Sequence, residues 1–339
     1  MDSLFGDAAE RLFAQTCPPD LIRRAEQGQA PADAWQACEA AGFADALVPE
    51  AQGGAGLALA DALPLATAAG RHLCPYPIVD TMLARAWLAQ AGAAQSRGSI
   101  ALAPHGWTLQ GREVAGIQVP WVRGADAVLA HIDGQAWLLP VARAAIAADG
   151  VHGSLAAPAR WSLDDGERID APAGLPALET LAATACAGLI AGAMDRVLAM
   201  TLDYANTRSQ FGKPIGRFQA VQQQISVMAE QVWAARMAAQ LAFQGLARRG
   251  LPQPLLAALG KARASQAVAR VADIAHAVHG AIGITDECDL QLYTRRLREW
   301  RLAAGTESYW HERIGTQALA SGLDALPFLR EALFDKEAA

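Results

Sequence analysis

The residues best suited to ligand chemistry lie in three segments of the C-terminal half of the chain. Residues 208–219 (RSQFGKPIGRFQ) place an arginine and two aromatic rings around a Gly-Pro turn. An arginine fork matches phosphate oxygens, and an aromatic ring suits an adenine face. Further on, Gly280 and Gly283 lack a Cβ, so backbone amides there can approach an anion. The third segment is the pair Gly305 and Thr306, preceded by Ala304.

Two of these features also have a purely structural interpretation. Gly212 and Pro214 can simply end a helix, with Arg208 placed at its C-terminal dipole. A basic run either holds a phosphorylated ligand or forms the solvated face of a helix, and it consists of Arg295, Arg296, Arg298 and Arg301.

The elements that must position these segments follow from periodicity. Helical spacing in both outer thirds, with short apolar runs between Gly, Asp and Pro in the middle, predicts an α+β fold. We expect an N-terminal helical domain over residues 1–97, a small antiparallel β domain of roughly three to six strands over 98–174, and a C-terminal four-helix bundle over 175–339. Its long helices are expected at about 177–206, 218–249 and 254–278, with shorter ones from Cys288 and Glu307.

Composition excludes several classes of protein. The 339 residues are 53% hydrophobic and carry a net charge of −6, which gives no broad positive field for nucleic acid. Five scattered cysteines form no CxxC pair, so neither a disulfide framework nor a metal site is expected. An acidic N-terminus argues against a signal peptide, and the apolar stretch 182–200 is interpreted as a buried helix rather than a membrane span. We therefore expect a cytoplasmic protein.

Together these segments resemble the acyl-CoA dehydrogenase family. Residues 208–219 resemble its RxxFGxxIxxFQ signature, and AVHGAIGITDECDLQLYTRR resembles its QxHGGxGxTxExxLxxxxRR segment. The resemblance extends over nearly the whole chain. It includes the N-terminal segment VPEAQGGAGLALADAL and the loop LAPHG at 102–106, which stands in place of the family's TEP-type loop beside the flavin.

The resemblance implies an FAD flavoprotein that dehydrogenates an acyl-CoA and passes electrons to an acceptor. It assigns cofactor contacts, partly to a neighbouring subunit's FAD, to Arg208, Phe211, Gln219, Gly280, Gly283 and Thr306. The family's glutamine and second glycine are replaced by Ala277 and Ala281, which removes one contact and crowds another.

The family's catalytic base is missing. Its glutamate directly precedes the Gly-Thr pair, where this chain has Ala304, and a second branch places the base at the position of Ala182. Glu179 lies about one helical turn before Ala182 and is the candidate for a displaced base, or else an acid that favours the helix dipole. Glu307 is a second local acid, expected to begin the last helix.

Three interpretations stay open from the sequence. The chain is a base-lacking subunit of a heterotetramer with a base-carrying acyl-CoA dehydrogenase, a homo-oligomeric enzyme with a displaced base, or a flavin-free acyl-CoA-binding or scaffold protein of the same fold. Motifs of unrelated enzyme classes, among them GxGxxG after a strand, GxxxxGK[ST], HExxH and GxSxG, are absent from the sequence.

Overall fold

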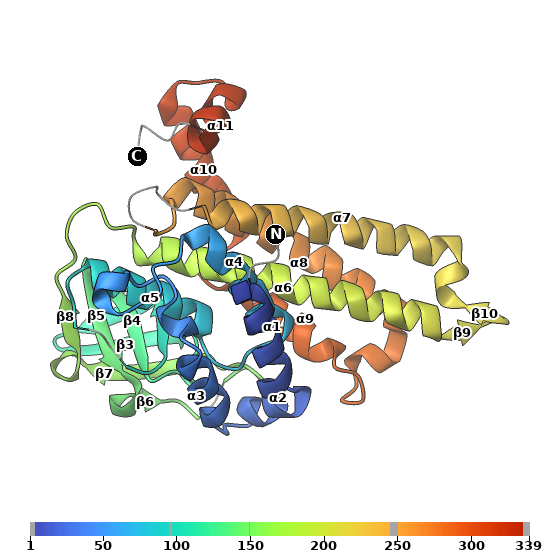
Figure 1. Ribbon diagram of the computed structural model, residues 1–339, viewed down its shortest axis with the longest axis horizontal. Helices are drawn as coiled ribbons and strands as arrows, with labels where there is room; N and C mark the ends of the chain where they lie inside the picture. Colours follow the sequence, from blue (N-terminus) through green and yellow to red (C-terminus); the bar gives the residue numbers. More distant parts are fainter. Residues whose placement is uncertain (1–3, 95–96, 149, 245–249, 335–339) are drawn as a thin grey trace.

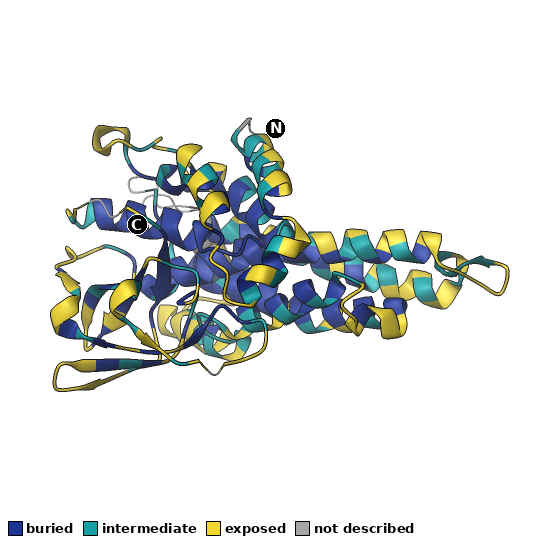
Figure 2. Ribbon diagram, turned by 90° about the horizontal axis from the view of Figure 1, so that it is seen from below, coloured by how far each residue is buried: buried dark blue, intermediate teal, exposed yellow. Residues whose placement is uncertain are grey.

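The computed structural model describes residues 4–94, 97–148, 150–244 and 250–334. Short helices of the N-terminal part and the strands of the middle part lie against one end of a bundle of long helices (Figure 1). The opposite end of the bundle projects beyond the rest of the molecule and is exposed at its tip (Figure 2). The α+β fold is confirmed, while the division at residues 97/98 and 174/175 stays a prediction.

Five α-helices make up the described N-terminal part: α1 (Leu4–Thr16), α2 (Pro19–Glu26), α3 (Ala32–Ala40), α4 (Leu63–Arg71) and α5 (Ile78–Gln90). Helix α5 is apolar almost throughout, and its residues from Ile78 to Ala89 are all buried. Because it is covered on every side, α5 can place side chains deep inside the molecule, against the first strand of the middle part.

Two four-stranded sheets form the middle part. Their strands are β1 (Ile100–Ala103), β2 (Trp107–Gln110), β3 (Glu113–Val119), β4 (Ala127–Ile132), β5 (Gln135–Pro140), β6 (Ala145–Ile146), β7 (Ala157–Ser162) and β8 (Glu167–Ile169). One sheet has the order β1-β4-β5-β8 and the other β2-β3-β7-β6.

These sheets differ from the sequence prediction in two ways. Among the described residues the two sheets contain eight strands, more than the three to six that would suffice for a compact module, because β2, β6 and β8 are short and mostly exposed and so lack an apolar pattern. The pair β1–β4 is parallel, since the chain visits the second sheet between them and returns in the same direction. The other pairs in these two sheets are antiparallel, as predicted.

The C-terminal helices are α6 (Leu178–Thr207), α7 (Gln219–Ala242), α8 (Pro254–His279), α9 (Leu290–Leu302), α10 (Glu307–Ser321) and α11 (Ala325–Phe334). The ends of α6 and α8 fall within one residue of the predicted bounds. Helix α7 ends earlier than predicted, because Phe243 leaves the helix and is fully buried against Gly188 of α6. The rest of that prediction, residues 245–249, lies outside the described residues.

Glycines allow α4 and α6 to touch. A Cβ on Gly192 would collide with the carbonyl oxygen of Thr67, and a Cβ on Gly70 would collide with that of Leu189. The two backbones therefore meet directly, which fixes the N-terminal half of α6 against the N-terminal helices.

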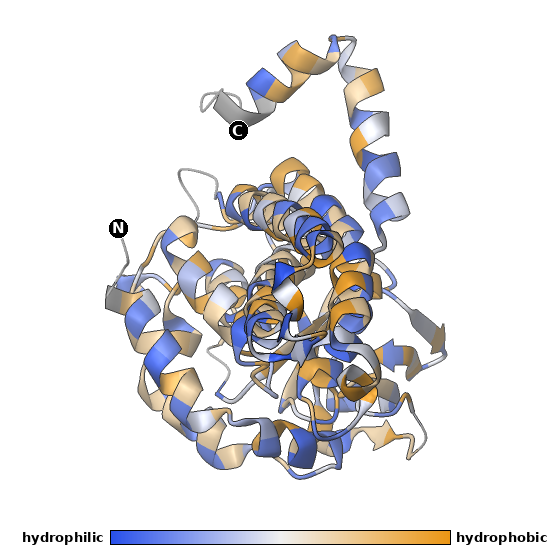
Figure 3. Cartoon of the chain, turned by 90° about the vertical axis from the view of Figure 1, so that its right-hand side faces the viewer, coloured by the Kyte–Doolittle hydropathy of each residue, from blue (hydrophilic) through white to orange (hydrophobic). Residues whose placement is uncertain are grey.

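Two of the described helices, α6 and α8, are long and apolar enough to cross a membrane by length and composition. In their most apolar stretches, 67% and 50% of the residues are buried inside the protein. That burial agrees with core helices of the bundle, as the sequence predicted for residues 182–200. Helices α10 and α11, in contrast, form an arm that points away from the bundle (Figure 3).

Candidate active site

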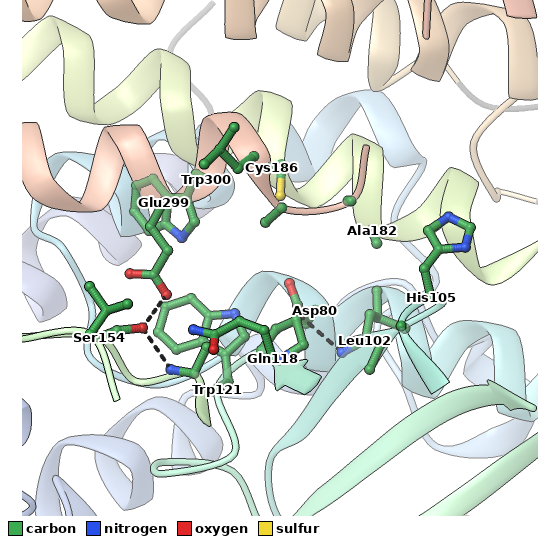
Figure 4. Close-up of a pocket in the computed structure, with 18 of the residues that line it drawn as sticks. Asp80, Leu102, His105, Gln118, Trp121, Ser154, Ala182, Cys186, Glu299 and Trp300 are labelled. Atoms are coloured by element: carbon green, nitrogen blue, oxygen red, sulfur yellow. Dashed lines mark hydrogen bonds between the residues drawn. The ribbon is translucent and has the colours of Figure 1, made fainter. Parts of the chain in front are cut away.

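A cavity of about 730 Å³ lies where the strand-rich part meets α6 and the loop after α9 (Figure 4). Its walls are mainly apolar and include Trp121, Leu189 and Trp300. The rings of Trp121 and Trp300 lie 6.4 Å apart, centroid to centroid, in a tilted arrangement. A cleft of this size and polarity suits a small-molecule ligand with a large apolar part.

Two alanines from distant parts of the chain face this cavity. Ala182 lies near the start of α6, and Ala304 lies in the loop between α9 and α10. Residues 102–106, which follow β1, border the same cavity. The fold thus brings together both alternative base positions and the TEP-like loop that the sequence analysis singled out.

The loop that carries Ala304 is held from two sides. The buried Lys261 ammonium donates hydrogen bonds to the carbonyl oxygens of Arg301 (3.0 Å) and Gly305 (2.9 Å). The Trp310 indole donates to the carbonyl oxygen of Ala304 at 2.9 Å. Ala304 itself has a φ of 53°, a left-handed conformation that costs a non-glycine residue about 1 kcal/mol. The position is therefore strongly constrained although it carries only a methyl group.

The residues that the sequence analysis expects to contact the cofactor phosphates lie at the opposite end of α6. Arg208 follows the last turn of that helix, and the strands β9 (Ser209–Gln210) and β10 (Lys213–Pro214) form a hairpin with Phe211 at its tip. The Phe211 side chain is 93% exposed, and Gln219 is exposed at the start of α7. Among the described residues, no acid forms an ion pair with Arg208. Its guanidinium is thus available to an external anion.

The glycine segment lies at the same end of the bundle. The ring of Tyr204, on the last turn of α6, stacks on that of His279, with centroids 4.5 Å apart. Gly280 follows directly, with a φ of 66° and open space where a Cβ would be, whereas Gly283 is buried against His279 and Leu290. Arg208 therefore offers an anion contact, and Gly280 leaves room for a ligand to approach the neighbouring segment, although its own amide donates to the carbonyl oxygen of His276.

Comparisons with known proteins agree with this layout. The acyl-CoA dehydrogenase N-terminal domain matches residues 2–99, and the C-terminal domain of that family matches residues 179–319. The chain belongs to the acyl-CoA dehydrogenase family. It is an FAD-dependent flavoprotein oxidoreductase of this family.

Relatives of similar length support the assignment. Acyl-CoA dehydrogenase IpdE2 of Mycobacterium tuberculosis is 32% identical over 76% of this chain and 78% of its own. IpdE2 of Mycolicibacterium smegmatis is 30% identical over 86% of this chain and 91% of its own. Among solved structures, the Tcur3481-Tcur3483 steroid acyl-CoA dehydrogenase (G363A variant) superposes with a TM-score of 0.79 at 25% identity, over 94% and 97% of the two chains.

FAD fits the residues at the far end of the bundle. The Arg208 guanidinium, which has no ion-pair partner among the described residues, suits the pyrophosphate of the dinucleotide, and the open space at Gly280 leaves room for it. The side chains of Ala277 and Ala281 are exposed at this end. When bound, FAD supplies the hydride acceptor of acyl-CoA dehydrogenases. The roles of Arg208, Phe211, Gln219, Gly280 and Gly283 stay predictions, of which the burial of Gly283 against His279 and Leu290 disfavours the last.

Thr306 and Glu307 have structural partners. The Thr306 hydroxyl accepts a hydrogen bond from the backbone amide of Tyr309 and so caps α10, and Glu307 forms an ion pair with Arg301. That ion pair holds the pKa of Glu307 below its usual value. Glu307 begins α10, as predicted, whereas a cofactor contact of Thr306 stays a prediction.

Glu179 is engaged outside the cavity. Its carboxylate accepts a 2.7 Å hydrogen bond from the Tyr309 hydroxyl, forms an ion pair with Arg313 (2.7 Å) and lies 3.2 Å from a ring nitrogen of His105. The hydrogen bond from His105, followed by those partners, lowers the pKa of Glu179. A general base for a weakly acidic proton needs a raised pKa instead. Its role as a displaced base stays a prediction, which this geometry disfavours.

Two carboxyl groups of described residues do line the cavity, those of Asp80 on α5 and Glu299 on α9. Glu299 is bound by the Ser154 hydroxyl (2.9 Å) and the Arg296 guanidinium (3.0 Å). Asp80 is only 6% exposed, and burial raises its pKa to about 7. The sequence analysis missed Asp80, which is the only acid in the buried helix α5 and shares it with the polar Thr81 and Arg85.

The basic run on α9 proves to be largely neutralised. Its four arginines pair with acids: Arg295 and Arg296 with Glu26, Arg298 with Asp273, and Arg301 with Glu307. These ion pairs join α9 to α2, α8 and α10. The structural interpretation of this run is therefore favoured over a site for a phosphorylated ligand.

Proposed function

We propose that this chain takes part in the α,β-dehydrogenation of an acyl-CoA thioester as a subunit that lacks its own base. The observation that carries the proposal is that Ala182 and Ala304, the two positions where a base is expected, line one cavity. In this reaction a base removes the α proton while a hydride leaves the β carbon. The methyl groups of these alanines cannot accept a proton, so a companion subunit supplies the glutamate in an active site of its own.

The length of α6 supports cofactor sharing between chains. Ala182 and Arg208 are 26 positions apart along α6 and its C-cap, which at 1.5 Å per residue separates them by about 39 Å. An extended flavin dinucleotide is shorter than that. Arg208 therefore serves an FAD whose flavin ring lies in another subunit's cavity, which requires an oligomer.

The relatives support both the assembly and the class of acyl group. The solved neighbour is named as a pair, Tcur3481-Tcur3483, and described as a steroid acyl-CoA dehydrogenase. A cavity of about 730 Å³ walled by Trp121 and Trp300 suits a bulky or cyclic acyl group. We therefore propose a heterotetramer acting on such a thioester.

The test compares the chain purified alone with the chain co-expressed with a base-carrying acyl-CoA dehydrogenase encoded beside it. We expect the co-purified assembly to be yellow and to oxidise acyl-CoA with an artificial electron acceptor, and the chain alone to be inactive. Turnover by the homogeneous chain alone would contradict the base-lacking subunit. A colourless assembly would instead favour a flavin-free binding or scaffold protein.

A further inference from the structure

We infer that Asp80 is a ligand-binding residue of the cavity, and that the cavity takes an acyl group bearing a carbonyl or hydroxyl oxygen. This inference rests on the proposed function, because the acyl part of a CoA thioester is the ligand that would fill the cavity. It adds a chemical requirement that the fold assignment does not contain.

One oxygen of the Asp80 carboxylate is bound by the protein, and the other faces the cavity. Its Oδ2 accepts a hydrogen bond of 3.1 Å from the backbone amide of Leu102 on β1. Its other oxygen points into the cavity, toward the side on which Ala182 and Cys186 lie (Figure 4). Within the described part of the chain, no group donates a hydrogen bond to that second oxygen, and no cation pairs with the carboxylate.

The fold itself does not need a carboxyl group here. The neighbouring Thr81 makes the equivalent contact, because its hydroxyl accepts a 2.9 Å hydrogen bond from the amide of Ile100. Both side chains thus accept hydrogen bonds from backbone amides of β1, and a neutral acceptor is enough to make such a bond. An ionisable group facing an apolar cavity is costly to bury unless a partner arrives.

The partner must be able to hydrogen-bond to a carboxyl group. Burial raises the pKa of Asp80 to about 7, so both protonation states are accessible near neutral pH. The neutral acid donates to a carbonyl oxygen, and the carboxylate accepts from a hydroxyl group. A plain hydrocarbon offers neither, and it would leave a buried polar group unpaired. Cys186, Leu189 and Trp300 also line the cavity and give it apolar surface that suits the carbon skeleton, while Gln118 adds a polar amide to the same lining.

The experiment measures binding rather than turnover. The co-purified assembly is titrated by calorimetry with CoA thioethers, in which a methylene replaces the thioester carbonyl and no acidic α proton exists. Only binding that differs between wild type and the Asp80 variants is assigned to this chain's cavity rather than to the companion's active site. The set comprises the S-octyl thioether and its three derivatives with a ketone at carbon 5, 6 or 7, which sample the depth of the cavity. We expect at least one ketone to bind wild type about tenfold more tightly than the octyl compound.

Three variants identify the origin of that preference. In Asp80→Leu the preference is expected to shrink to about twofold or less, because the polar partner is gone. In Asp80→Asn most of it remains, since an amide still donates to a ketone. Thr81→Val is the matched control, because it breaks the same type of contact to β1 without touching the cavity wall, and it should keep the full preference.

Three results of this experiment would overturn the inference. It fails if wild type shows no preference, if Asp80→Leu keeps it, or if Thr81→Val loses it as Asp80→Leu does. If none of the four thioethers binds wild type, the proposed function falls together with the inference. If the octyl compound binds as well as its ketones, Asp80 alone loses its role.

Discussion

The ammonium group of Lys261 donates a 2.9 Å hydrogen bond to the carbonyl oxygen of Gly305. Lys261 lies on α8 with no exposed surface, and its two other acceptors are the Ser265 hydroxyl and the Arg301 carbonyl oxygen. One side chain therefore satisfies both the C-terminal end of α9 and the loop that carries Ala304. This arrangement keeps the loop in place at the cavity even though the loop holds no base.

The substitution Lys261→Met is expected to destabilise the protein. Methionine fills a similar volume but removes the donor to the Gly305 carbonyl oxygen and leaves the Arg301 carbonyl oxygen only the longer 3.4 Å hydrogen bond from the Ser265 hydroxyl, so the free energy of unfolding should fall by about 2–4 kcal/mol. Chemical denaturation monitored by circular dichroism measures the change. Lys213→Met, on the hairpin, is the control and should lie within about 0.5 kcal/mol of wild type. An unchanged unfolding midpoint for Lys261→Met would show that these bonds contribute little.

Asp80 predicts a specific pH dependence of stability. Its pKa in the folded protein, about 7, lies above its ordinary value of 3.8, so the folded state holds the proton more tightly than the unfolded chain. The free energy of unfolding of wild type should therefore fall relative to Asp80→Asn as pH rises from about 4 to 7, by about 1 kcal/mol per pH unit, and level off above. The Cys186 thiol, whose pKa burial raises to about 12, stays neutral in this range.

The measurement is the difference in melting temperature between Asp80→Asn and wild type at several pH values. Thr81→Val serves as control, because it alters the neighbouring contact to β1 without removing an ionisable group, so its difference should stay flat. A flat difference for Asp80→Asn as well would mean that the cavity is wet enough to solvate the carboxylate.

Arg208→Ala is expected to weaken FAD binding by the assembly. Loss of a charge-assisted contact to phosphate corresponds to about a tenfold to hundredfold lower affinity. The ratio of flavin to protein absorbance in the purified assembly reports the loss. Arg217→Ala removes the same charge from the turn that follows the hairpin and should keep its flavin. Equal flavin content in both variants would refute the role of Arg208.

Glu179→Gln should leave turnover of the assembly within about twofold of wild type, because Glu179 does not line the cavity and its pKa is lowered. The loss of its ion pair with Arg313 and of its contact with His105 should cost about 1 kcal/mol of stability. Steady-state kinetics and a thermal melt separate the two effects. A fall in turnover by two or more orders of magnitude would establish Glu179 as the base after all.

The sequence predicted the helical bundle well because its elements are long and periodic. Pro254 at the start of α8 and Gly280 at its end are local signals that need no tertiary information. The cavity was harder to foresee, since Asp80, Ala182 and Ala304 meet only through packing of three separate segments. Likewise, the partners of Glu179 lie on α10 and on the loop after β1, and their distance along the chain does not predict these contacts.

The length of α6 also separates the effects of lesions at its two ends. Its N-terminal half borders the cavity and its last turn leads into the hairpin, so a lesion at one end leaves the other end intact. In an assembly where each flavin is held by two chains, a copy damaged at the hairpin leaves a companion subunit's flavin loosely held, whereas a copy damaged at its own base-lacking cavity leaves that flavin in place. Lesions at the two ends of one helix should therefore form two separate classes of allele, only one of which depletes flavin from the companion.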